Sequence, residues 1–333
     1  MKNSIKAIFV IIGTIIGAGF ASGQEIYSFF NIYQENGILG ILISSFLIGI
    51  SIYIILKKSS ELKVNSYNEL LEKSAISKNI KIILKFIINL FLLISFYIMV
   101  AGFGAYFKQE FNIPNILTAI IILIICYITF MKNIEGIAKV NTIIIPVLII
   151  IVIGLGIKCN IISSISKASM ANMEVSGNWL ISSIEYASYN TILLVPILLS
   201  LKNYAEKNEK KISIITTIIF FTLSIIIYFI MFNMEGLENV EIPLVYIANK
   251  FGSIYSIVYS IVVVSAIYTT MISAGYGFLN NCTKTKKSYK LLAIIICISA
   301  VFISNFSFAK LVNLTYPVFG LLGLIQLWFI VRK

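Results

Sequence analysis

Long apolar runs separated by short polar loops constrain the fold of this chain most. Of its 333 residues, 59% are hydrophobic and 12% are charged, whereas about a quarter of the residues in a soluble domain are charged. Ten runs are each about long enough to cross a bilayer core, at 5–30, 37–56, 80–107, 114–131, 137–157, 178–201, 212–232, 253–279, 289–306 and 309–331. The sequence therefore predicts an all-α polytopic membrane protein in which residues 1–333 form a single transmembrane domain.

The positions of the basic residues agree with this segment count. When successive loops are assigned to alternate sides of the membrane, 21 of the 26 Lys and Arg residues fall on one side and 5 on the other. Cytoplasmic loops carry the excess of positive charge. We therefore expect a multi-pass protein of the bacterial cell (inner) membrane with both termini in the cytoplasm. A cleaved signal peptide over the first run would upset this alternation.

The first run contains an interruption. Glycines stand at positions 13, 17, 19 and 23, and each weakens a helix by about 1 kcal/mol relative to alanine. Backbone that is not hydrogen-bonded to itself survives at membrane depth only where it is buried in protein or lines a cavity. The stretch 13–25 is therefore a candidate binding site.

The sixth run is the second expected interruption. Glu185 and Asn190 lie in its middle, and Pro196 removes a backbone donor. A carboxyl group inside a span is costly to bury, so Glu185 is functional or paired, unless it lies near the outer mouth and meets water.

The ten segments divide into two sets of five, 1–157 and 178–331. Because five is odd, the second set starts from the opposite side of the membrane and is inverted relative to the first. Inverted repeats with broken helices at corresponding positions are typical of secondary transporters, whose sites lie near the membrane midplane.

Residues 17–25, followed by Phe29 and Phe30, resemble the first helix of the bacterial YkvI-like membrane proteins. That family is similar to the amino acid-polyamine-organocation superfamily, whose members have the leucine-transporter fold of five plus five inverted helices. The likeness extends over most of the chain, including residues 186–190 and 242–251. It implies a leucine-transporter-like fold of about ten transmembrane helices, with helices 1 and 6 broken.

The resemblance also implies an ion site between the first and eighth segments. In sodium-coupled members of this fold, the ion is held by carbonyls and hydroxyls at positions that correspond here to Gly13, Ile16, Ala266, Thr269 and Thr270. Sodium favours oxygen ligands, and carbonyls freed by unwinding supply them. The alternative is that both threonines bond back to their own helix. Proton-coupled relatives place a lysine of helix five in this space, and Lys139 keeps that option open.

The solute site implied by the resemblance lies at the two breaks. Exposed amides of helix one bind a carboxylate, and helix six gives selectivity, at positions matching Ala18, Gly19, Phe20, Ser183, Ala187, Ser188 and Asn190. Tyr97 in the third segment is a further candidate, with close helix packing as the alternative. Glu25 and Glu185 depart from the family pattern. We interpret them as an outer gate, a proton-linked pair or an attraction for a cationic solute.

The sequence thus predicts a secondary active transporter of small organic solutes, amino acids or related amines, coupled to Na⁺ or H⁺ by alternating access. Beyond the coupling ion no cofactor is expected, and the expected partners are the solute and the lipid bilayer, not nucleic acid. A passive channel or a sensor-like membrane component with a transporter fold is the alternative. An enzyme is not expected, because no nucleophile and base pair is visible and histidine is absent.

Overall fold

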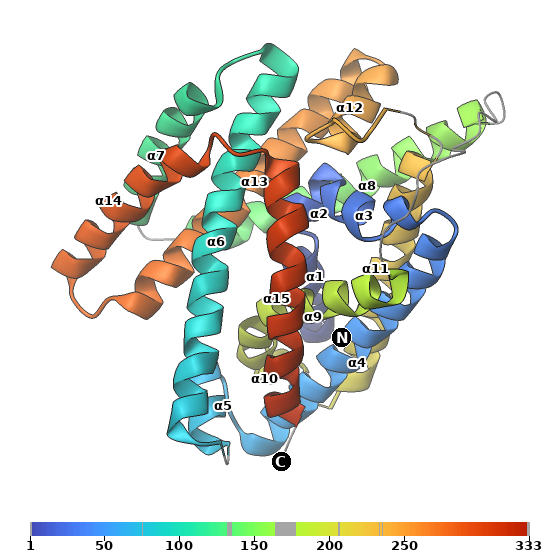
Figure 1. Ribbon diagram of the computed structural model, residues 1–333. Helices are drawn as coiled ribbons and strands as arrows, with labels where there is room; N and C mark the ends of the chain where they lie inside the picture. The colour runs from blue at the N-terminus through green and yellow to red at the C-terminus, as the bar shows by residue number, and fades with distance from the viewer. Residues whose placement is uncertain are drawn as a thin grey trace.

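Helices make up the secondary structure of the described chain (Figure 1). The computed structural model describes residues 2–74, 76–131, 135–163, 178–205, 207–232, 234 and 236–331. Side chains are described over the same ranges except at 2–3, 135–144, 160–163 and 331. No strand occurs within these ranges.

Each expected segment coincides with helical structure. The helices that follow the first segment are α4 (Asn36–Leu62), α6 (Lys78–Phe111), α7 (Asn115–Met131), α8 (Glu135–Ser163), α9 (Trp179–Ser200), α11 (Glu209–Phe232), α13 (Ser253–Cys282), α14 (Lys286–Ile303) and α15 (Phe308–Val331). Among the described residues, five of these helices (α4, α6, α11, α13 and α15) are long and apolar enough to cross a membrane. The division into two inverted repeats, 1–157 and 178–331, remains a prediction.

The first segment is interrupted, as its glycines predict, and the structure divides it at two places. It consists of α1 (Lys2–Ile15), α2 (Ala18–Ser22) and α3 (Gln24–Phe29), followed by the 3₁₀ turn η1 (Asn31–Tyr33). Gly17 is extended, and Gly23 adopts the left-handed conformation with φ of 82°. A left-handed residue ends a right-handed helix, and glycine adopts this conformation without steric cost. Gly23 therefore separates α2 from α3.

The expected break in the sixth segment is not present. The helix α9 continues through the polar stretch and carries Pro196 inside it. The side chains of the polar stretch instead donate to carbonyls one turn earlier, as Ser188 does to Ile184 (2.7 Å) and Asn190 does to Tyr186 (2.9 Å). Such back-bonding satisfies the polar groups within a regular helix, and for this reason they do not open it.

The helix α9 lies in the interior, between α4 and α15. Figure 1 shows the first segment near the middle of the molecule and α7 with α14 together at one edge. Large apolar side chains are exposed on the outer helices, among them Ile254 (75%), Leu314 (71%) and Phe302 (70%). A soluble monomer rarely exposes so much contiguous apolar surface. The exposed apolar side chains of the outer helices are therefore expected to contact lipid.

Three further short helices, α5 (Tyr67–Lys73), α10 (Lys202–Ala205) and α12 (Pro243–Lys250), stand between the long ones in the chain, and two of them have clear N-terminal signals. The N-terminus of α5 is capped by Ser66, whose hydroxyl accepts from the amide of Glu69. The amide of Asn65 donates to the Glu69 carboxylate (2.9 Å), and this bond lowers the pKa of Glu69. The helix α12 begins with proline, which suits a first helical position.

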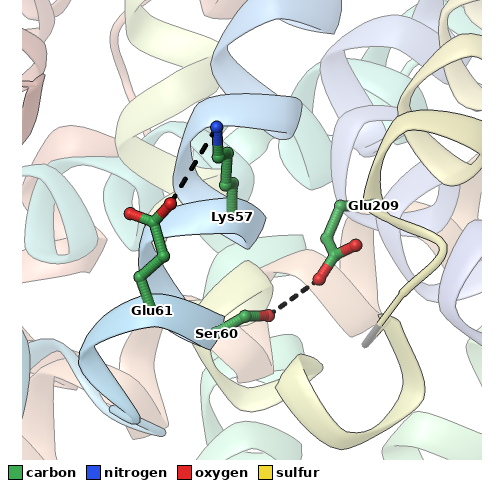
Figure 2. Close-up of polar contacts among 4 residues, drawn as sticks. All are labelled: Lys57, Ser60, Glu61 and Glu209. Carbon is green, nitrogen blue, oxygen red and sulfur yellow. Dashed lines mark hydrogen bonds and ion pairs between the residues drawn. The ribbon is translucent and has the colours of Figure 1, made fainter.

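The end of α4 nearest α5 is joined to α11 by polar contacts (Figure 2). The hydroxyl of Ser60 donates to Glu209 of α11 (2.9 Å), while Lys57 pairs with Glu61 one turn along α4 (3.9 Å). Both side chains of the ion pair are exposed, so the pair contributes little to stability. Of these two contacts, the Ser60 bond joins α4 to α11, whereas the ion pair lies within α4.

The crossing of α9 and α15 yields a stability prediction. A Cβ atom at Gly323 would lie 2.3 Å from the carbonyl oxygen of Ser188, whereas one at Gly154 of α8 would meet nothing within 4 Å. We expect Gly323→Ala to destabilise the protein by about 1–3 kcal/mol through overpacking. The matched control Gly154→Ala should be neutral or gain up to about 1 kcal/mol from helix propensity. Thermal unfolding in detergent measures both, and equal melting temperatures would contradict the close crossing.

Candidate functional site

The break between α1 and α2 leaves backbone groups without their helical partners. The amide of Ile16 donates to Ile12 (2.7 Å), and the amide of Ala21 donates to Gly17 (2.9 Å). Between these bonds, within the described residues, the carbonyls of 13–16 and the amides of 17–20 have no backbone partner. The side chains of Ile16, Ala18 and Phe20 are buried. Free donors and acceptors thus meet at a buried point of the fold.

The helix α13 faces this break. The Thr270 hydroxyl lies 3.7 Å from the position that a Cβ atom would have at Gly17. The hydroxyl of the buried Thr269 donates to the carbonyl of Ala266 in its own helix (3.2 Å). Of the predicted residues of α13, the structure thus places Thr270 close to the first break, whereas Thr269 bonds back to its own helix as the alternative reading expects. Gly13, by contrast, packs against Ile145 of α8.

The carbonyls that α2 exposes are partly satisfied by one tyrosine. The fully buried hydroxyl of Tyr259 on α13 donates to the carbonyl of Ala21 (2.7 Å). Within α2, Ser22 donates to the carbonyl of Gly19 (2.7 Å). The helix α2 is therefore anchored to α13.

The helix α3 is anchored to different elements. Ser182 of α9 donates to the carbonyl of Phe29 (3.0 Å), and the amide group of Asn31 in η1 donates to the carbonyl of Tyr228 on α11 (3.0 Å). The two short helices on either side of Gly23 are therefore attached to different parts of the protein.

Glu25 lies inside the protein, with only 5% of its surface exposed. Its carboxyl group accepts hydrogen bonds from the hydroxyls of Tyr189 and Tyr186 on α9, the latter at 3.5 Å. It also folds back on the first break, because a Cβ atom at Gly19 would lie 1.9 Å from its Oε1 atom. The predicted gate residue thus reaches the predicted solute position at Gly19.

Aromatic rings surround this carboxyl group. The ring of Tyr186 lies 4.9 Å from that of Phe30 and 6.2 Å from that of Phe220, and Tyr189 lies 4.7 Å from Tyr316. The rings come from five helices and from the residue that joins α3 to η1, and all are buried: Phe20, Phe29, Phe30, Tyr186, Tyr189, Phe220 and Tyr316. Sequence reasoning assigned neither Tyr186 nor Tyr189 to the site, although the two stand three residues apart and therefore on the same helical face. No sequence pattern marked Phe220.

The predicted selectivity residues of α9 have polar groups engaged within their own helix. The hydroxyl of Ser183 donates to Trp179 (2.6 Å), and it also lies against Gly40 of α4. Ser188 and Asn190 bond back in the same way, and Ala187 is buried. Their assigned roles remain predictions.

Two further predicted residues lie apart from Glu25. The hydroxyl of Tyr97 is hydrogen-bonded to Ser299 of α14 (2.7 Å), which agrees with helix packing. Glu185 packs against Gly320 of α15, and it is not among the groups that contact Glu25. In the described part of the chain, no lysine or arginine bonds to either carboxyl group. The side chain of Lys139 lies outside the described residues.

The sequence of the chain is similar to those of two bacterial proteins. No family model matches the chain. It is 27% identical over 333 residues to the uncharacterised membrane protein YkvI of Bacillus subtilis strain 168, covering 97% of this chain and 93% of YkvI. It is also 28% identical over 330 residues to the uncharacterised protein YyaD of that organism, covering 97% of this chain and 94% of YyaD. The chain is a homologue of these YkvI- and YyaD-type membrane proteins.

Solved structures show the fold. Mhp1 in an inward-facing conformation matches with a TM-score of 0.65 and 14% identity, covering 95% of this chain and 72% of Mhp1. A Na⁺-coupled sialic acid symporter matches at 0.64 and 15%, covering 97% and 77%. A manganese transporter of Eremococcus coleocola matches at 0.64 and 14%, covering 96% and 76%. These neighbours have the leucine-transporter fold, and this all-helical chain matches it over nearly its whole length, while the inverted repeat remains a prediction.

The Tyr259 bond yields a second prediction. Tyr259→Phe leaves the buried carbonyl of Ala21 without this donor, which should cost about 1–3 kcal/mol. Tyr67 provides the matched control, because its buried hydroxyl has no partner among the described residues. Tyr67→Phe should therefore be neutral or slightly stabilising. Thermal unfolding compares the two variants, and an equal loss in both would contradict a specific role for the Tyr259 bond.

Proposed function

We propose that this protein is a secondary active transporter of small organic solutes, amino acids or related amines, that works by alternating access. The observation that supports this most is the unpaired backbone at residues 13–20, which is enclosed by α9 and α13 inside a leucine-transporter fold. Discontinuous helices with free termini at a buried position are the usual construction of such sites. The positive-inside count supports a bacterial cell-membrane location with cytoplasmic termini.

The coupling ion in this proposal is Na⁺ or H⁺. For sodium, the free carbonyls of Gly13 and Ile16 and the hydroxyl of Thr270 supply the hard oxygen ligands that the ion favours. The contact between Gly17 and Thr270 supports this position. The solute in this proposal lies at Ala18, Gly19 and Phe20, whose free amides favour a carboxylate.

A proteoliposome experiment tests the function. A thermal-shift screen of amino acids and amines first identifies solutes that stabilise the purified protein. Labelled solute should then accumulate above its external concentration when a sodium or proton gradient is imposed, and it should only equilibrate when the gradients are removed. Equilibration under every gradient would instead indicate a passive channel, and binding without flux would indicate a sensor-like component.

The sodium site yields a third prediction. Thr270→Val keeps the shape of the side chain but deletes its oxygen, so we expect at least a tenfold, that is about 1.4 kcal/mol, weaker sodium dependence of uptake. Thr222→Val is the matched control, because Thr222 is exposed on α11 and bonds back to Ile218. An unchanged sodium response in Thr270→Val would exclude Thr270 as a ligand.

A further inference from the structure

We propose that Glu25 binds the coupling proton, and that solute and proton therefore bind cooperatively. This inference rests on the proposed transport function and names the residue that would link the proton to the solute. The carboxyl group of Glu25 lies between α9, α15 and the first break.

An unpaired carboxylate is costly at this position. Glu25 is 5% exposed, and no described lysine or arginine contacts it. A buried charge must be neutralised by a counter-ion or by a proton, since its desolvation costs at least several kcal/mol. The chain contains no histidine or aspartate that would share the proton. The side chain of Glu25 is thus a proton-binding group in its own right.

The groups that face Glu25 suit a carboxyl group that is charged in one state and neutral in the other. From α9 the hydroxyls of Tyr186 and Tyr189 donate to it, and from α15 the phenol of Tyr316 lies near it. The helix α2 has no titratable side chain. The adjacent elements carry other titratable groups, none of which bonds to the Glu25 carboxyl group among the described residues: Tyr27 of α3, Tyr33 of η1, Glu185 of α9, Glu209, Lys210, Lys211 and Tyr228 of α11, and Lys310 of α15. Tyr228 donates instead to the carbonyl of Gln34. The side chains that reach Glu25 are therefore the tyrosines of α9 and α15. These neighbours are phenols, and a phenol stabilises a carboxylate without cancelling its charge.

The contact with Gly19 links the proton to the solute. The Oε1 atom of Glu25 lies directly against Gly19, where the free amides of 17–20 would receive a solute carboxylate. Two carboxylates within about 4 Å repel strongly in a poorly solvated site. A proton on Glu25 removes this repulsion. Each ligand thereby favours the binding of the other.

Protonation is also linked to access. Glu25 is covered in this structure, so proton exchange with water requires the α2–α3 region to open. A charged Glu25 favours states in which water reaches it, and a neutral Glu25 favours the covered state. Acidic pH should therefore shift the population towards the covered state.

Hydrogen exchange of the full-length protein in lipid nanodiscs tests this step without a solute. At acidic pH, after correction for intrinsic exchange rates, peptides over 16–30 should exchange at least about threefold more slowly than at mildly alkaline pH. Glu25→Gln should abolish this difference and stay protected at both pH values. Tyr189→Phe should move the midpoint to higher pH, because it removes a donor to the charged form. Glu61→Gln is the matched control, because Glu61 is an exposed carboxylate of α4, and it should keep the response of the parent protein.

The outcomes separate this inference from the proposed function. A pH response that persists in Glu25→Gln, or that is absent from the parent protein, overturns the proton role of Glu25. Sodium-driven accumulation that is identical in Glu25→Gln and insensitive to pH overturns it too, but leaves the transporter intact. Failure of every gradient to drive accumulation overturns the transporter, while the hydrogen-exchange result still tests Glu25 as a proton-binding group.

Discussion

Backbone hydrogen bonding is the constraint on which the rest of this structure depends. In a hydrocarbon environment a helix satisfies its own amides and carbonyls, and an interrupted helix does not. Here the interruption at residues 16–17 is enclosed by other helices, and the carbonyl of Ala21 in the following helix α2 accepts from a tyrosine hydroxyl of α13. The surrounding helices are therefore arranged to shield one short stretch of exposed backbone.

The same stretch concentrates the polar chemistry of the protein interior. Glu25 folds back onto Gly19, the hydroxyls of two α9 tyrosines reach its carboxyl group, and Thr270 approaches Gly17 from the other side. Around these groups the side chains are aromatic or aliphatic. Few polar groups in an apolar enclosure interact strongly, because little water screens them.

The sequence predicted what depends on local chemistry. Glycine at 17 and 23 marked the two interruptions of the first segment, and the lengths of the apolar runs located the long helices. It failed at α9, where Glu185, Asn190 and Pro196 predicted a break, because the helix is continuous and Asn190 bonds to a carbonyl of that helix instead. Polar residues in a span have both options, and tertiary packing decides between them. The hydrogen bonds from Tyr186 and Tyr189 to Glu25, and the packing of Phe220 against Tyr186, join segments far apart in the sequence, and no local pattern specifies them.

The different attachments of α2 and α3 have a mechanical consequence. One helix is tied to α13 through Tyr259, and the other to α9 and α11 through Ser182 and Asn31. A displacement of α13 relative to α9 would therefore change the angle between α2 and α3, while each helix keeps the hydrogen bonds that attach it to its neighbour. Gly23 is the single residue between them, so its backbone would rotate to absorb that displacement. The residue that interrupts the helix is thus also the place where the fold is able to bend.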